Sequence, residues 1–124
     1  MFARNFTEYI TAGNPNTSIS TLEGLSHFGD ALVRRRVSET TRCTKAMLTE
    51  LAKDNSSEVR IAVAHNSKTP LAVLKKLLQD TNPDVRFSLA TNYRLPLEFL
   101  LALQQDENPY VARRAGKTVA RLMA

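Results

Sequence analysis

The sequence predicts an all-α fold, a solenoid of between four and five repeats with two helices in each. The first observation is a period of 26 residues that runs through most of the 124-residue chain. The second is that each period holds two short segments whose apolar residues recur at spacings of three and four, as in amphipathic helices. Such a period is typical of solenoids, in which each repeat buries its apolar face only by stacking on its neighbours.

The period is visible as columns of identical residues, one from each repeat. One valine column and two leucine columns are apolar, and an aspartate column lies in the turns that lead to the following repeats. The members are Val33, Val59, Val85 and Val111; Leu48, Leu74 and Leu100; Leu51, Leu77 and Leu103; and Asp54, Asp80 and Asp106. The apolar columns are the predicted core.

The register predicts one domain with atypical ends. A degenerate repeat occupies residues 1–28, regular repeats begin at about residues 29, 55 and 81, and a capping helix occupies 109–124. In the degenerate repeat, Leu22 and Leu25 hold the leucine positions. Atypical terminal repeats are expected because they cap the stack.

The first helix of each repeat is predicted to begin after a polar cap. The pairs Asn82–Pro83 and Asn108–Pro109 each put a capping side chain before a proline at the first helical position. Asn66 and Asn92 are predicted to end the helix, as residues that tolerate the left-handed conformation. The expected core face holds Val59, Ala62 and Val63 in one copy and Val85, Ser88 and Leu89 in the next. The small residues Ala12, Ala64 and Ala90 would let the two helices approach closely.

The second helix of each repeat is predicted to start at Pro70 or Pro96. Its apolar residues are Leu74, Leu77 and Leu78 in one copy and Phe99, Leu100 and Leu103 in the next. The predicted capping helix carries one apolar stripe and a basic face. The stripe is Val111, Ala115, Val119 and Leu122, and the basic residues are Arg113, Arg114, Lys117 and Arg121.

The repeat resembles the bacterial leucine-rich repeat variant, a two-helix unit with the pattern Asp-x4-Val-Arg-x2-Val-Ala-x-Asn-x3-Pro-x3-Leu-x2-Leu. It is also similar to HEAT-like repeats, which share the Asp and Val-Arg signals. The matching positions are Asp54, Val59, Arg60, Val63, Ala64, Asn66, Pro70, Leu74 and Leu77, then Asp80, Val85, Arg86, Leu89, Ala90, Asn92, Pro96, Leu100 and Leu103. The resemblance implies a right-handed superhelix and no particular activity.

Composition argues against several classes of function. Some members of the variant family bind an iron–sulfur cluster through several cysteines, but Cys43 is the only cysteine here, in a turn column with Thr69 and Leu95 that tolerates many side chains. Neither His27 nor His65 belongs to a metal-binding pair. No apolar run is long enough to cross a bilayer and no signal peptide is evident, so we expect a cytoplasmic protein without a membrane or cofactor role.

An arginine follows the core valine in three repeats. These residues, Arg34, Arg60 and Arg86, form either a row of cations for phosphates or a structural ladder. An aspartate lies six residues before two of them, and in HEAT-like families such residues bond along the stack, so we favour a ladder of Asp54, Arg60, Asp80 and Arg86. The first repeat departs from the pattern, since Phe28 holds the aspartate position and Asp30 would have to substitute.

A second basic column lies in the turn between the two helices and has no acidic counterpart. Its members are Arg42, Lys68 and Arg94, with the aromatic Tyr93 beside the last. Together with Arg113, Lys117 and Arg121 of the final helix, they are the candidate residues for a partner. The alternative for the turn column is solvated loop cations.

No catalytic motif is present, so we expect a protein-interaction scaffold or adaptor rather than an enzyme. The net charge of +5 leaves non-catalytic nucleic-acid binding through phosphate contacts as the alternative function. The oligomeric state stays open.

Overall fold

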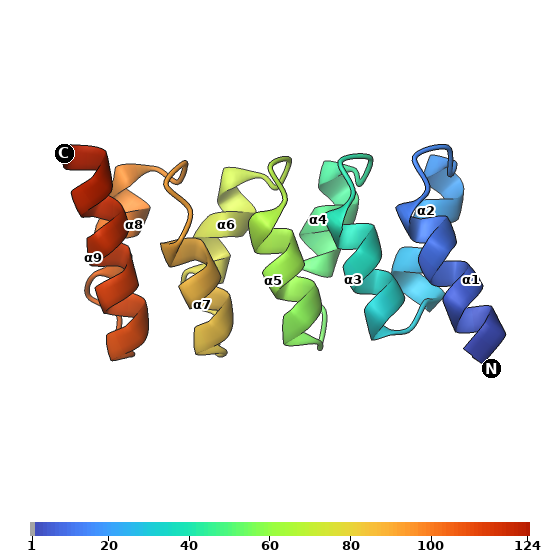
Figure 1. Ribbon diagram of the computed structural model, residues 1–124, viewed down its shortest axis with the longest axis horizontal. Helices are drawn as coiled ribbons and strands as arrows, with labels where there is room; N and C mark the ends of the chain where they lie inside the picture. The colour runs from blue at the N-terminus through green and yellow to red at the C-terminus, as the bar shows by residue number, and fades with distance from the viewer. Residues whose placement is uncertain (1) are drawn as a thin grey trace. The chain divides into compact units, whose positions relative to one another are not determined.

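A computed structural model of the chain describes the backbone of residues 2–124 and the side chains of residues 6–124 (Figure 1). Residue 1 of the predicted degenerate repeat lies outside the described residues. The described chain is all-helical, with nine helices and no strand, which confirms the all-α class. The contacts divide the chain into two compact units, with the boundary between Pro70 and Leu71.

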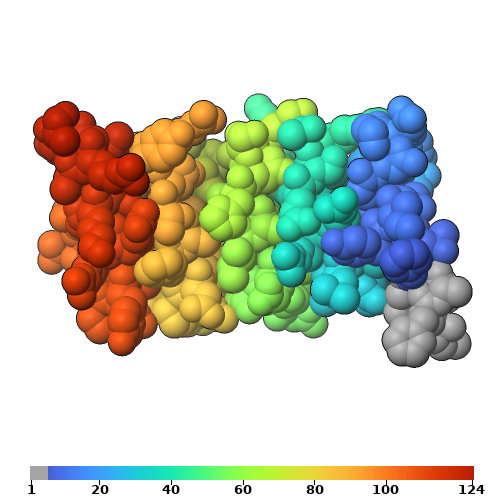
Figure 2. Space-filling view, viewed as in Figure 1, coloured from blue at the N-terminus to red at the C-terminus, as the bar shows by residue number. Residues whose placement is uncertain are grey.

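The N-terminal unit, residues 1–70, contains five helices. They are α1 (Phe2–Gly13), α2 (Ile19–Phe28), α3 (Ala31–Glu39), α4 (Lys45–Leu51) and α5 (Ser57–His65). Helix α3 is central, because it packs against α1, α2 and α5. Figure 2 shows α1, α3 and α5 side by side on one face of this unit, and in Figure 1 α2 and α4 lie behind them.

The C-terminal unit, residues 71–124, contains four helices. They are α6 (Leu71–Leu77), α7 (Pro83–Ala90), α8 (Leu97–Leu103) and α9 (Pro109–Met123). Helix α9 packs against both α7 and α8. The second helices α6 and α8 each begin one residue after the proline predicted to start them.

The periodic apolar columns form the core of each unit. All four valines of the valine column and all six leucines of the two leucine columns are buried. The small-residue positions Ala12, Ala64 and Ala90 are buried too, and Ser38 holds the same register position and is also buried. Apolar residues that recur at the same register positions therefore place the same face of each repeat in the core.

The predicted stripe of the final helix is wrong at its C-terminal end. Leu122 is 44% exposed, whereas Thr118 is buried. Thr118 is buried because its hydroxyl donates to the carbonyl of Ala90 at 2.6 Å, so its polar group is satisfied inside the unit. A stripe drawn from apolar residues alone misses a buried threonine of this kind.

Asn66 ends helix α5 as predicted, but the left-handed conformation expected there is wrong. No described residue has a positive φ, and Asn66 is extended, with φ −74° and ψ 124°. Its side-chain amide instead donates to the carbonyl of Ser38 at 2.8 Å and to that of Thr40 at 3.0 Å. Asn66 and Thr118 each reach a carbonyl 28 residues earlier in the chain, so the two side chains perform the same bridging.

The predicted proline-linked caps are confirmed. Asn82 accepts a hydrogen bond from the backbone N–H of Asp84 at 2.8 Å. Asn108 accepts from the backbone N–H groups of Tyr110 and Val111, at 2.9 and 3.2 Å. These caps satisfy amide donors that a short helix leaves without intrahelical acceptors.

The turn column that holds Cys43 is buried at all four of its positions. Thr17, Cys43, Thr69 and Leu95 are all buried, and the two threonines place their hydroxyls on backbone carbonyls, of Thr11 at 2.5 Å and of Val63 at 2.6 Å. Burial raises the pKa of the Cys43 thiol to about 11, against the opposing charge of Lys68. Cys43 therefore stays a neutral thiol at neutral pH.

Replacing a core leucine should cost far more stability than replacing an exposed one. Leu48 is fully buried, so Leu48→Ala should lower the free energy of unfolding by about 2–5 kcal/mol in urea denaturation. Leu32 is 63% exposed in the same unit, so Leu32→Ala should change it by less than about 0.5 kcal/mol. Equal effects of the two substitutions would contradict the core described here.

Candidate functional site

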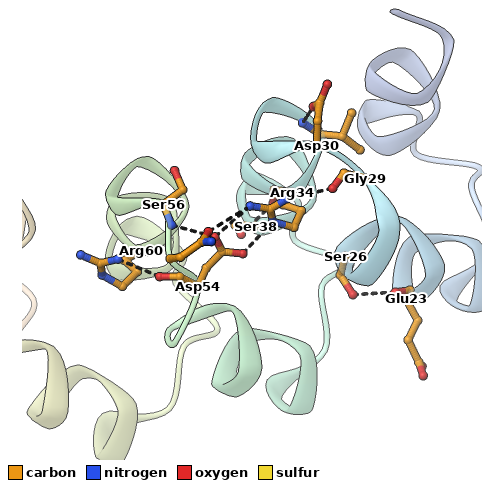
Figure 3. A network of polar contacts seen from close by, with 11 residues as sticks. Glu23, Ser26, Gly29, Asp30, Arg34, Ser38, Asp54, Ser56 and Arg60 are labelled. Atoms are coloured by element: carbon orange, nitrogen blue, oxygen red, sulfur yellow. Dashed lines mark hydrogen bonds and ion pairs between the residues drawn. The ribbon is translucent and has the colours of Figure 1, made fainter. Parts of the chain in front are cut away.

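The arginines that follow the core valines are engaged inside the protein. Arg34 forms a bidentate pair with Asp54, with Nε to Oδ2 at 2.7 Å and Nη2 to Oδ1 at 3.1 Å (Figure 3). Its third nitrogen, Nη1, donates to the carbonyl of Gly29 at 2.8 Å. One guanidinium thus links the turn that precedes α3 to the turn that precedes α5.

The same clamp occurs in the C-terminal unit. Arg86 pairs with Asp106 through Nε to Oδ2 at 2.8 Å and Nη2 to Oδ1 at 3.2 Å, and its Nη1 donates to the carbonyl of Asp80 at 2.5 Å. Arg60 donates from Nη1 to the carbonyl of Asp54 at 2.7 Å. The arginine column is therefore occupied by these contacts.

Asp30 does not take the missing ladder position. Its carboxylate caps α3 by accepting the backbone N–H of Val33 at 3.0 Å, and Arg34 bonds the carbonyl of Gly29 in place of an aspartate carbonyl. Phe28, which holds the aspartate register, is 87% exposed.

The Asp54 carboxylate is stabilised in its ionised form. Burial raises its pKa, but the hydrogen bonds from Arg34 and from the Ser56 amide, with the charges of Arg34 and Arg60, hold the pKa below its ordinary value. The Ser56 amide donates to Oδ1 at 2.9 Å, so the same carboxylate also shapes the turn before α5.

The second basic column is divided between the two units. Arg42 donates from Nη1 to the carbonyl of Pro15, so it holds a turn of the N-terminal unit, while Lys68 is exposed. Arg94 belongs to the C-terminal unit, where its guanidinium lies over the Tyr93 ring, 5.8 Å from the centroid. Arg94 and Tyr93 are thus brought together as neighbours in one turn.

The C-terminal unit contains a groove between α9 and the segment that follows α7. Its volume is about 400 Å³. It is lined by Thr91, Tyr93, Arg114, Thr118, Arg121 and Leu122, and we call it the α9 groove. The four residues from α9 stand at spacings of three and four, so they share one side of that helix.

The α9 groove is cationic and partly apolar. None of the described residues that line it is acidic, and α9 itself contains no aspartate or glutamate. Tyr93 is 61% exposed and Leu122 is 44% exposed, so both offer apolar surface to a ligand. The Nε of Arg114 is buried and has no hydrogen-bond acceptor within the described part of the chain. The guanidinium groups of Arg114 and Arg121 give the groove two cationic groups, which suit an anionic ligand group.

The groove gathers some of the predicted partner residues and omits others. Tyr93 and Arg121 line it, whereas Arg113 and Lys117 are exposed on α9 outside the lining. Arg114 was not among the predicted site residues. The signal for it is present in the 26-residue register, where Arg36 and Arg114 interrupt a column otherwise filled by Ile10, Ala62 and Ser88.

Across the described residues, no group of three or more His, Cys, Asp or Glu side chains is placed to hold a metal ion. Within the same range, the helices are too short or too polar to traverse a bilayer. No protein-family profile, curated protein or solved structure matches the chain.

The Arg34–Asp54 clamp should make stability depend on pH. Because folding lowers the pKa of Asp54, its contribution is present above the ordinary aspartate pKa of about 3.9 and is lost as pH falls through the folded value. Asp54→Asn should therefore destabilise the protein at pH 7 and flatten the loss of stability below pH of about 4. Urea denaturation across pH checks this, and parallel profiles for the two proteins would contradict it.

Proposed function

We propose that this chain is a non-catalytic, cytoplasmic helical-repeat protein that acts as an interaction scaffold or adaptor and binds a protein partner in the α9 groove. The observation that carries the proposal is the lining of the groove. It combines Arg114 and Arg121 with the exposed apolar surface of Tyr93 and Leu122, without an acidic residue among its described lining. Arginine and tyrosine are the side chains most enriched in the energetic centres of protein interfaces.

We further propose that the helices form a right-handed α-solenoid of between four and five repeats, of the leucine-rich repeat variant or HEAT-like kind. The 26-residue period supports this, as do the alternation of first and second helices and the recurrence of the arginine clamp at Arg34 and Arg86. Such repeats commonly present a binding surface built from neighbouring repeats.

Binding rather than catalysis fits the chemistry of the side chains. The Cys43 thiol is buried and protonated at neutral pH, which makes it a poor nucleophile. The groove itself holds guanidinium groups, hydroxyls and apolar surface, which are recognition groups for an acidic and partly apolar partner.

Nucleic-acid binding is the alternative function. One observation favours it, because the exposed Tyr93 ring beside the Arg94 guanidinium could stack on a base next to a phosphate contact. A nucleic acid would bind with an affinity that falls steeply with salt and without need of the apolar groove surface.

The two functions are separated by binding measurements on the full chain. We expect a fluorescein-labelled peptide of glutamate and leucine residues to bind, and a labelled 20-base single strand or duplex of DNA or RNA not to bind, at 150 mM salt. Arg121→Gln should weaken peptide binding by about tenfold. Lys76→Gln removes the same charge from an exposed position on α6, and it should change the affinity by less than about twofold.

Tight binding of a nucleic acid with no binding of the peptide would replace the proposed function with the alternative. Binding of neither probe, or equal effects of Arg121→Gln and Lys76→Gln on the peptide affinity, would overturn the assignment of the α9 groove.

A further inference from the structure

We infer that the α9 groove binds a carboxylate group of an acidic peptide segment, in the place that Glu39 occupies at the equivalent position of the N-terminal unit. This inference rests on the proposed function and names the chemistry of the partner. It comes from comparing two positions of the chain that are three periods apart.

The pair Arg35–Arg36 on α3 and the pair Arg113–Arg114 on α9 stand at the same register of the repeat. In the N-terminal unit, the Glu39 carboxylate lies between the first pair. Its Oε2 is 3.4 Å from Nε of Arg35, and its Oε1 is 3.8 Å from Nη1 of Arg36. A carboxylate from the same helix thus contacts both arginines, and Arg35 Nη1 also lies 3.6 Å from Oε2 of Glu58 on α5.

The surroundings of the two arginine pairs also correspond. Arg36 lines a small hollow of about 170 Å³ with Gly13, Glu39 and Thr40. At the matching register, the α9 groove is lined by Thr91, Arg114 and Thr118 and reaches about 400 Å³. In both places the arginine Nε is buried and lacks an acceptor within the described residues. The two hollows are therefore versions of one site.

The difference between them is one of charge. The residue three positions after Arg36 is Glu39, whereas the residue three positions after Arg114 is Lys117. Residues three apart on a helix are neighbours, so Lys117 adds a cation where the N-terminal site has its carboxylate. Helix α9 supplies no acidic residue to replace it. Neither α9 nor the described lining of the groove therefore offers a carboxylate to Arg113, Arg114 and Lys117, which leaves this place open to the carboxylate of a ligand.

A carboxylate is the anion that this geometry favours, because Glu39 already fills the equivalent place as one. Its two oxygens match the planar fork of a guanidinium. The exposed Tyr93 and Leu122 then contact an apolar side chain next to the carboxylate. The occupant is therefore a peptide segment in which acidic and apolar residues alternate, rather than a nucleic acid.

The test is to introduce a carboxylate on α9 at the position where the carboxylate of the ligand would bind. Lys117→Glu recreates the arrangement of Arg35, Arg36 and Glu39. We expect it to lower the affinity for the glutamate–leucine peptide by about tenfold or more, measured by fluorescence anisotropy at 150 mM salt. Lys75→Glu makes the same charge change at an exposed position of α6 and should change the peptide affinity by less than about twofold. Lys117→Gln, which adds no carboxylate, should lower the peptide affinity by no more than about threefold.

A second arm tests the ligand. The same peptide with glutamine in place of every glutamate should bind at least about tenfold more weakly to the unchanged protein. Lys117 is exposed, so the thermal midpoint of each variant, followed by circular dichroism, should match that of the unchanged protein.

The failures of the inference and of the proposed function are distinguishable. If the peptide binds and Arg121→Gln lowers the affinity for it, the proposed function holds. The carboxylate inference is then overturned if the glutamine peptide binds equally well, or if Lys117→Glu behaves like Lys75→Glu. The carboxylate inference is also overturned, in favour of a phosphate ligand, if the peptide does not bind but a nucleic acid does and Lys117→Glu abolishes the binding of that nucleic acid.

Discussion

The structure depends on satisfying the backbone groups at the ends of very short helices. The helices are short, from seven residues in α4, α6 and α8 to fifteen in α9, so many of their backbone N–H and C=O groups lie near an end and lack an intrahelical partner. The polar columns of the repeat answer this need. Arg34, Arg60, Arg86, Asn66 and Thr118 all direct side-chain donors to backbone carbonyls in turns or at helix ends. The apolar columns can stay buried because these polar groups are satisfied.

This constraint also decides which cations are available to a partner. An arginine that holds a carbonyl and an aspartate together contributes to folding, and Arg86, 8% exposed, presents little surface to a ligand. Arg42 likewise donates to a backbone carbonyl, that of Pro15. Arg114 of α9 stands in a different register column from the clamp arginines, and the residue three positions after it is Lys117 rather than a glutamate. Its charge is therefore not balanced by a carboxylate of its own helix.

Sequence reasoning located the core and the caps well, because both depend on local spacing. It placed the valine and leucine columns in the core and the proline-linked caps at Asn82 and Asn108. It misjudged residues whose surroundings come from other helices. Leu122 was predicted in the core but is exposed. Asn66 bridges carbonyls instead of adopting a left-handed conformation. The turn column of Cys43 is buried.

The amino-acid sequence by itself determined the all-α class, the 26-residue register and the faces that each helix buries, since these follow from periodicity within a few residues. Only the tertiary structure decided the partners of the polar side chains. Arg34 and Asp54 are 20 residues apart, and Asn66 reaches carbonyls 26 and 28 residues away. The same holds for the groove that joins Tyr93 to Arg114 and Arg121. Residues at such separations meet only after the helices have packed, so their contacts depend on helix orientation and side-chain direction rather than on spacing in the chain.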